Sequence, residues 1–568
     1  MPRIAVALAL AASLFVPART IAATHAEKID ALIHSYNELR QFNGSALVAE
    51  KGRVILRKGY GMANMEWRIP NAPDTKFRIA SNTKQFTSLL IMQLVSEGRV
   101  GLDDKITKYL PTYRKDTGDK ITVRNLLTHT SGIPEYGNNK PEWTEKGRDP
   151  HSVADFVREY AAGDLEFEPG TQFRYTNSGY VLLGAIIEAV TGKAYEEVLQ
   201  ERIFGPLGMK DSGYDHAETV IRNRAGGYRL TPDGYRNATY LDMSNLYAAG
   251  AIYSTVDDLF KWDRALYTDK LLDEAHRKVM WTPVRNRYAF GEVVGKMTLH
   301  DGKTEVSFIA HDGGTAGFHA VQLRMPDSQD LVLLLDNASD DKSVDQLGSG
   351  IIDILHGIQP PPPKQPLREE LIKTMDASGV PAALARYREL KAREPQKWDF
   401  NEQVLNGLGY DALERGEVDG AIDAFRLNVE EYPKAWNVYD SLADAYEVDG
   451  DREMALANYK KSLELNPRNS NGEEAVKRLQ QPAGPADVPT LARYAGTYRL
   501  SSGGELIVIR EAGKLVLQTP GSQRADLVTD SATRFHRGDG RSSIDFASDG
   551  RSLVLHQDGS DVSGKRVK

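Results

Sequence analysis

The sequence predicts a multidomain protein: an α/β body, then an α-helical repeat region, then a small antiparallel β domain. Three observations give this prediction. Strand patterns at both ends of residues 24–358 enclose a helical middle. A proline run at 359–366 cannot continue a helix and favours a stiff, extended spacer. Beyond it, two helical segments match each other at a spacing of 34 residues, and short strands with glycine turns follow.

The α/β body is predicted from alternating and apolar patterns. Residues 44–61 predict two strands joined at Lys51-Gly52, and residues 319–337 predict a strand, a turn and a strand. A helix is expected from Ser81 to a glycine stop at Gly98. Further helices are expected over residues 180–192 and 343–358.

The region 367–481 is expected to be helical and repetitive. Gly416–Pro433 matches Gly450–Pro467, with glycine, alanine, aromatic and proline positions in phase. This spacing resembles tetratricopeptide (TPR) repeats, and Gly379–Pro395 looks like a degenerate earlier unit. Two interpretations stay open: the repeats bind a protein or peptide partner, or they are a spacer. A second linker at 482–489 precedes the β domain, 490–568, for which a barrel or a sandwich is expected.

The first 23 residues have the layout of a secretory signal peptide. A short positive head is followed by an apolar run, Ile4–Val16, and then by small residues. The run is short for a bilayer, so we expect export to a bacterial periplasm or the exterior, with no membrane span after cleavage. The formal net charge of -8 and the lack of a long basic run make nucleic acid a poor candidate partner. The absence of cysteine excludes disulfides and thiolate metal sites.

The first chemical signal is Ser81 with Lys84 three residues later, at the head of an apolar helix. Residues three apart lie on one helix face, about 5–6 Å apart at Cβ. A serine hydroxyl becomes a nucleophile when a nearby base takes its proton, and a lysine is such a base if burial lowers its pKa. Alone the spacing is a weak signal, because Ser339 and Lys342 repeat it in an acidic turn.

Two further segments carry candidate groups. Tyr175-Thr176-Asn177 precedes a predicted helix, where a phenol near a lysine could shuttle its proton. Asn177 could orient a substrate carbonyl or hold the lysine. His311-Asp312-Gly313-Gly314 precedes the predicted strand pair, and its glycines would let a substrate backbone approach closely. Each segment alone also fits ordinary turn chemistry.

Together these segments belong to six ordered blocks that resemble the serine β-lactamase and penicillin-binding-protein superfamily. The blocks begin at Phe77, Leu126, Pro169, Ile203, Ala248 and His311. The resemblance covers about residues 27–358 and is strongest to the class C β-lactamase-like, esterase-type branch. It implies a mixed sheet flanked by helices, plus an all-helical lobe, with the active site between them. The β domain resembles the lipocalin-like tail domains of some hydrolases of this kind.

The resemblance also implies roles for the candidate residues. Ser81 would be the acylated nucleophile, and Lys84 and Tyr175 would share the general acid and base work. Substrate contacts would come from Asn177, His311, Asp312 and Gly313. The backbone N–H groups of Ser81 and Gly314 would form the oxyanion hole. No metal or organic cofactor is expected.

His311 departs from the family pattern, which usually has lysine there. A histidine is mostly neutral at pH 7, so a substrate carboxylate should be read less strongly. We therefore expect an exported serine hydrolase acting on esters or small amides and peptides. A class C-type β-lactamase, a D-Ala-D-Ala carboxypeptidase, and a catalytically dead scaffold that binds partners through its repeats remain alternatives. Of two other histidines, His129 is expected to be structural and His319 to lie on the surface.

Overall fold

The structure is a computed structural model. It describes residues 23–136, 147–231, 234–338, 341–467, 469–480, 488–511, 514–518, 524–529, 533–537, 542–547, 550–557 and 560–567. The predicted signal peptide, except for its last residue, and most of the second linker lie outside these ranges. The chain divides into two compact units, Met1–Pro363 and Lys364–Lys568. The boundary between them falls inside the proline run.

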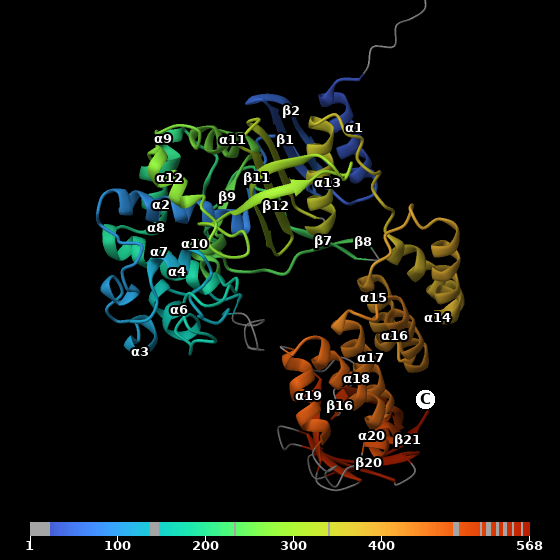
Figure 1. Ribbon diagram of the computed structural model, residues 1–568. Helices are drawn as coiled ribbons and strands as arrows, with labels where there is room; N and C mark the ends of the chain where they lie inside the picture. The colour runs from blue at the N-terminus through green and yellow to red at the C-terminus, as the bar shows by residue number, and fades with distance from the viewer. Residues whose placement is uncertain are drawn as a thin grey trace, which may run out of the picture. The chain divides into compact units, whose positions relative to one another are not determined.

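The first unit is built on a six-stranded sheet with the strand order β10-β11-β12-β13-β1-β2 (Figure 1). Its strands are β1 (Gly44–Glu50), β2 (Arg53–Tyr60), β10 (Val293–Thr298), β11 (Glu305–Thr315), β12 (Phe318–Met325) and β13 (Asp330–Asp336). Both predicted strand pairs are confirmed: Lys51-Gly52 joins β1 to β2, and β12 and β13 form the second pair.

The prediction of a mixed sheet is wrong, because every pairing in this sheet is antiparallel. The physical reason lies in the connections. Strands β10 to β13 follow one another through short turns, and such turns join antiparallel neighbours. Strand β1 pairs with β13, also antiparallel, and Gly44 lies opposite Asp336.

Alternating side chains of the sheet enter two cores. On one face, α1 (His25–Glu38) and α13 (Asp341–Leu355) pack over residues that include Val48 and Val332. Leu47 and Leu333, their neighbours in sequence, belong to the larger core beneath the helical lobe. This is the two-sided burial that the strand period of two produces.

The remaining elements of the first unit form the helical lobe and small sheets. Its α-helices are α2 (Thr83–Ser96), α3 (Lys115–Gly118), α4 (Val123–Leu127), α6 (Val153–Tyr160), α7 (Asn177–Thr191), α8 (Tyr195–Leu199), α9 (Gly205–Leu207), α10 (Tyr247–Gly250), α11 (Val256–Ala265) and α12 (Glu274–Met280). Shorter helical turns are η1 (Ala80–Asn82), η2 (Ile106–Lys108), η3 (Gln200–Phe204) and η4 (Met243–Asn245). The small antiparallel sheets are formed by β3 (Met62–Asn64) with β4 (Ile69–Pro70), by β5 (Phe77–Arg78), β9 (Ile252–Ser254) and β6 (Gly213–Tyr214), and by β7 (Tyr228–Thr231) with β8 (Gly234–Asn237).

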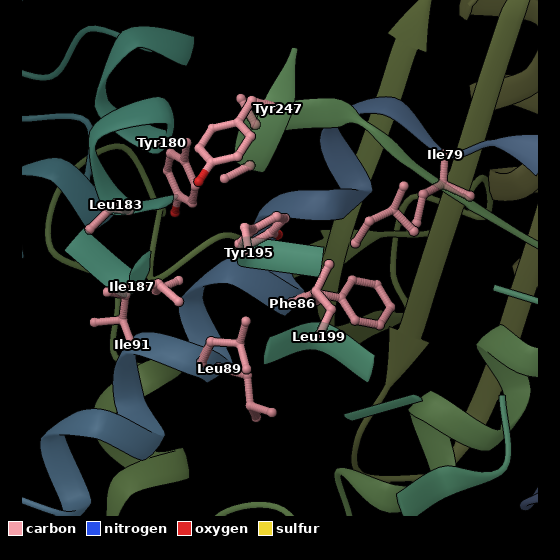
Figure 2. Close-up of a cluster of buried hydrophobic side chains, with 14 of the residues drawn as sticks. Ile79, Phe86, Leu89, Ile91, Tyr180, Leu183, Ile187, Tyr195, Leu199 and Tyr247 are labelled. Atoms are coloured by element: carbon pink, nitrogen blue, oxygen red, sulfur yellow. The ribbon is translucent and has the colours of Figure 1, made fainter. Parts of the chain in front are cut away.

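Helix α2 is the centre of the lobe. All of its residues from Thr83 to Leu94 are buried. Figure 2 shows Phe86 and Leu89 of this helix among side chains of α7, α8 and α10. A helix that is buried on all sides has little freedom to shift, so it holds its first turn in a fixed place.

The second unit contains helices followed by a barrel. The helices are α14 (Leu367–Arg393), α15 (Glu402–Glu414), α16 (Val418–Glu431), α17 (Trp436–Asp449), α18 (Arg452–Leu465), α19 (Ser470–Gln480) and α20 (Val488–Tyr494). The matched segments have matched structure: Gly416 and Gly450 both have positive φ, at 78° and 91°, and a helix follows each. Ala421 and Ala455 are both buried. The assignment of these helices to TPR repeats stays a prediction.

The C-terminal strands form a closed eight-stranded barrel, so the barrel alternative is confirmed and the sandwich alternative is wrong. The strands are β14 (Gly496–Leu500), β15 (Glu505–Glu511), β16 (Lys514–Gln518), β17 (Ala525–Thr529), β18 (Arg534–Arg537), β19 (Ser542–Phe546), β20 (Ser552–Gln557) and β21 (Ser560–Arg566). Aromatic side chains, including Tyr494 and Phe535, pack into its core. The lipocalin-like character of this domain stays a prediction. No helix among the described residues is both long and apolar enough to cross a membrane.

Candidate active site

The predicted site residues come from four elements of the first unit and from the residues beside them. Ser81 lies in η1 and Lys84 in the first turn of α2. Tyr175 lies just before α7, and Asn177 is the first residue of that helix. The histidine and glycine motif precedes the strand pair of β12 and β13, as predicted, and it lies near the end of a further strand, β11.

Strand β11 offers an open edge beside Ser81. Strand β10 pairs with β11 only as far as Ala310, so residues 311–315 continue past its end. A Cβ added at Gly313 would lie 2.4 Å from the carbonyl oxygen of Ile79 and 2.7 Å from the backbone nitrogen of Ser81. Only glycine permits this approach of the strand to η1.

Lys84 is 0% exposed, and its amine has three hydrogen-bond partners. Nζ lies 2.9 Å from Ser81 Oγ, 2.8 Å from Asn177 Oδ1 and 2.9 Å from the carbonyl oxygen of Ala249. Burial lowers the pKa of Lys84 to about 7, although the negative charges of Glu135 and Asp312 act in the opposite direction. Near pH 7 a large fraction of the amine is therefore neutral and can accept a proton from the adjacent hydroxyl.

Tyr175 adds a phenol to this pair. Its side chain hydrogen-bonds with that of Ser81, and burial of the hydroxyl raises the pKa of Tyr175. The phenol thus stays protonated at neutral pH. Its ring lies 5.0 Å from Lys84 Nζ and 4.2 Å from the ring of His129, and the residue as a whole keeps 37% of its surface exposed. The arrangement places a protonated phenol within hydrogen-bond distance of the serine hydroxyl.

Asn177 is held between Lys84 and a carboxylate that the sequence reading assigned no role. Its Nδ2 donates to Glu135 Oε1 at 2.8 Å, and its backbone N–H donates to Glu135 Oε2. Glu135 lies in the second of the six blocks that resemble the family. The block drew attention to this stretch of the sequence, but nothing in it indicated that Glu135 pairs with Asn177. The Ala249 carbonyl was also missed, because every residue type carries that group.

His311 faces the same site in its neutral form. Burial, and then the nearby Lys84, lower the pKa of His311 to about 4. Its Nε2 lies 3.1 Å from the Tyr288 hydroxyl. Asp312 and Gly314, which alternate with His311 and Gly313 along the strand, are exposed. The expected contacts of these four residues with substrate stay predictions.

The two other histidines are both buried. His129 Nδ1 accepts a hydrogen bond of 3.2 Å from the backbone of Thr176, and the His129 carbonyl accepts one of 2.9 Å from Arg174. It thereby supports the segment that carries Tyr175, as expected of a structural residue. The expectation for His319 is wrong: it is 1% exposed, because β12 is covered by α13 and its Nε2 lies 3.2 Å from Asp345 Oδ1.

Across the ranges that the structure describes, no group of three or more histidine, cysteine, aspartate or glutamate side chains could hold a metal ion.

Comparison with known proteins gives the family. A family profile described as Beta-lactamase matches residues 29–348, more than half of the chain. The chain belongs to the beta-lactamase family. Among curated relatives, penicillin-binding protein 4* of Bacillus subtilis strain 168 is 30% identical over an alignment of 341 residues that covers 56% of this chain and 73% of the relative. The protein is thus a serine hydrolase of the β-lactamase and penicillin-binding-protein-like superfamily.

Solved structures extend the comparison. The D-amino acid amidase of Ochrobactrum anthropi SV3, complexed with L-phenylalanine amide, is 27% identical with a TM-score of 0.51, and the match covers 58% of this chain and 99% of the amidase. The octameric penicillin-binding protein homologue of Pyrococcus abyssi is 20% identical with a TM-score of 0.50, over 95% of this chain and 99% of the homologue. At that identity the second likeness concerns the fold alone.

Proposed function

We propose that this beta-lactamase family member hydrolyses esters or small amides and peptides through an acyl-enzyme on Ser81. The observation that carries the proposal is the buried Lys84 amine, 2.9 Å from Ser81 Oγ and with a pKa lowered to about 7. A lysine in this state is a general base at neutral pH.

The proposed reaction has two halves. Lys84 takes the Ser81 proton while Oγ attacks the substrate carbonyl, and the resulting oxyanion is stabilised by backbone N–H groups, for which Ser81 and Gly314 are the candidates. The C–O or C–N bond then breaks, and Lys84 with Tyr175 returns a proton to the leaving group. A water molecule next loses a proton to the same pair and attacks the acyl carbon, which releases the acid and restores the Ser81 hydroxyl.

Two observations favour esters and amides over carboxylate-bearing β-lactams. His311 is neutral at pH 7 and so supplies no fixed positive charge for a substrate carboxylate. A relative of known structure is named as a D-amino acid amidase. The alternative activities, β-lactamase or D-Ala-D-Ala carboxypeptidase, draw support from the relatives named as penicillin-binding proteins. A panel of chromogenic esters, D-amino-acid anilides and a chromogenic cephalosporin on one preparation separates these activities.

Two further parts of the proposal concern the whole chain. We propose export through the signal-like residues 1–23, which suits the bacterial penicillin-binding proteins among the relatives. We also propose a protein or peptide partner for the repeat region. A scaffold without catalysis would use that region alone and would have no need of a neutral lysine beside a serine.

Labelling with a fluorophosphonate tests the nucleophile. The wild type should label at Ser81. Ser81→Ala should lose labelling, because it lacks the hydroxyl oxygen that Lys84 activates and that reacts with the fluorophosphonate. Ser339→Ala is the matched control, since Lys342 follows Ser339 at the same spacing, and it should label like the wild type. Equal labelling of wild type and Ser81→Ala would refute the assignment, and labelling of neither would favour the scaffold.

A further inference from the structure

The hydrogen bonds around Lys84 specify which proton pattern its amine adopts. A neutral amine has two N–H bonds and one lone pair. The Ala249 carbonyl oxygen, 2.9 Å away, can only accept. If Asn177 also presents its oxygen, at 2.8 Å, these two acceptors take both N–H bonds, and the lone pair is left for Ser81 Oγ. The base is then oriented before substrate arrives.

This orientation depends on which end of the Asn177 amide faces the lysine. The two ends have nearly the same shape, so packing alone does not select one. A reversed amide would place Nδ2 against Nζ, donate to the lone pair and turn an amine N–H toward Ser81. The serine hydroxyl would then have no base to accept its proton.

Glu135 supplies the selection. A carboxylate only accepts hydrogen bonds, and its two oxygens receive the side-chain Nδ2–H and the backbone N–H of Asn177. If the side-chain amide reverses, Oδ1 would face Glu135 Oε1, so this hydrogen bond is replaced by a repulsion between two oxygens, whereas the backbone bond is unaffected. A carboxylate placed to favour the start of α7 would explain the backbone contact, but the side-chain contact serves only the amide orientation.

We propose that Glu135 is a positioning residue for the hydrolase reaction: it holds the Asn177 amide with its oxygen toward Lys84, so that the lysine lone pair faces Ser81. The inference rests on the proposed Ser81 mechanism. Glu135 also acts by charge, because it raises the pKa of Lys84, as Asp312 does. Among the described residues, other titratable groups close to the amine are His129, His311, Tyr175 and Tyr180.

Glu135→Gln is the informative variant, since it keeps the size of the side chain but replaces one acceptor by a donor. With a neutral chromogenic ester, we expect the plateau of kcat/KM to fall by up to about 100-fold, as for a misplaced catalytic group. In a plot of kcat/KM against pH, the midpoint of the rise on the acid side should move to lower pH, because the charge that raises the pKa of Lys84 is gone. Glu135→Asp keeps the charge, so its midpoint should stay at the wild-type value.

Two controls separate positioning from general damage. Glu166→Gln removes a carboxylate that pairs with Arg174, the residue before Tyr175, but that does not contact Asn177. It should leave both the plateau and the midpoint of kcat/KM unchanged. In an Asn177→Ala background, Glu135→Gln should change the plateau by less than about twofold, because the amide it orients is absent. Thermal melting of each variant shows that it is folded.

The outcomes distinguish the two proposals. If the wild type neither labels nor hydrolyses the ester, the proposed function fails. If the wild type is active and folded Glu135→Gln keeps the plateau of kcat/KM, whether or not the midpoint shifts, the positioning role alone is overturned, because the midpoint reports only the charge of Glu135. An equal loss from Glu135→Gln with and without Asn177 would also overturn it, since Glu135 would then act independently of the amide.

Discussion

At the scale of single residues, the central fact is a lysine placed where lysines rarely lie. Burial of an ammonium group is unfavourable, so the folded protein shifts Lys84 toward its neutral form. Three oxygen partners then keep the amine satisfied in either protonation state. The same burial that costs stability therefore produces the base.

The pH dependence of hydrolysis follows from this shift. Because the pKa of Lys84 is lowered to about 7 and its neutral form is the base, kcat/KM should rise as pH increases through that value. Two pH units below the midpoint, kcat/KM should be about 100-fold under the plateau. Stopped assays with a neutral ester between pH 5 and 9 measure this.

A substitution at Asp312 tests whether the pKa of Lys84 sets the midpoint of kcat/KM against pH. Its charge raises the pKa of Lys84, so Asp312→Asn should move the midpoint to lower pH, whatever happens to the plateau. A profile without an acid limb in the wild type would contradict the assignment of Lys84 as the base.

At the scale of elements, the site depends on the contact between β11 and η1. Ala80, just before Ser81, has a φ of 45°, a conformation that non-glycine residues adopt only when their surroundings hold them. Gly313 of β11 lies against this turn and leaves no room for a side chain. The strand, the strained turn and the buried α2 together determine where Ser81 Oγ lies.

Gly313→Ala should therefore displace η1. The added Cβ would lie 2.4 Å from the Ile79 carbonyl oxygen and 2.7 Å from the Ser81 nitrogen, both rigid backbone atoms. We expect kcat/KM to fall by about 100-fold or more, the size of effect seen when an oxyanion donor is lost. Steady-state kinetics at the pH plateau measures the loss.

Gly295→Ala on the neighbouring β10 is the matched control. Its added Cβ would lie 3.0 Å from the flexible Arg287 side chain and 3.6 Å from Phe308, an ordinary contact, so activity should stay near wild type. If Gly313→Ala had wild-type kinetics, the close contact between β11 and η1 would not be needed to position Ser81 Oγ.

At the scale of the whole molecule, all of the candidate site residues lie in the first of two units. The helices and the closed barrel of the second unit have their own cores.

A fragment of residues 24–363 should accordingly keep its reactivity. We expect fluorophosphonate labelling of the fragment at a rate within about threefold of the full chain, because no group of the site is removed. Gel-based labelling time courses measure both, with cooperative thermal melting as the test of folding. A folded fragment that fails to label would show that the second unit contributes to the site.

The sequence by itself determined what neighbouring residues decide: the Ser81 to Lys84 spacing, the hairpin at Lys51-Gly52, the proline boundary and the repeated helices. These features follow from local backbone preference and side-chain period. Much of the site could be predicted because its members lie in motifs whose order resembles one family.

Only the tertiary structure decided the protonation chemistry. The lowered pKa of Lys84, its contact with the Ala249 carbonyl and the Glu135–Asn177 pair depend on segments that meet only when the chain folds. The antiparallel sense of the sheet and the burial of His319 were settled in the same way. Burial and hydrogen bonding across distant segments set a pKa, and no local pattern carries that information.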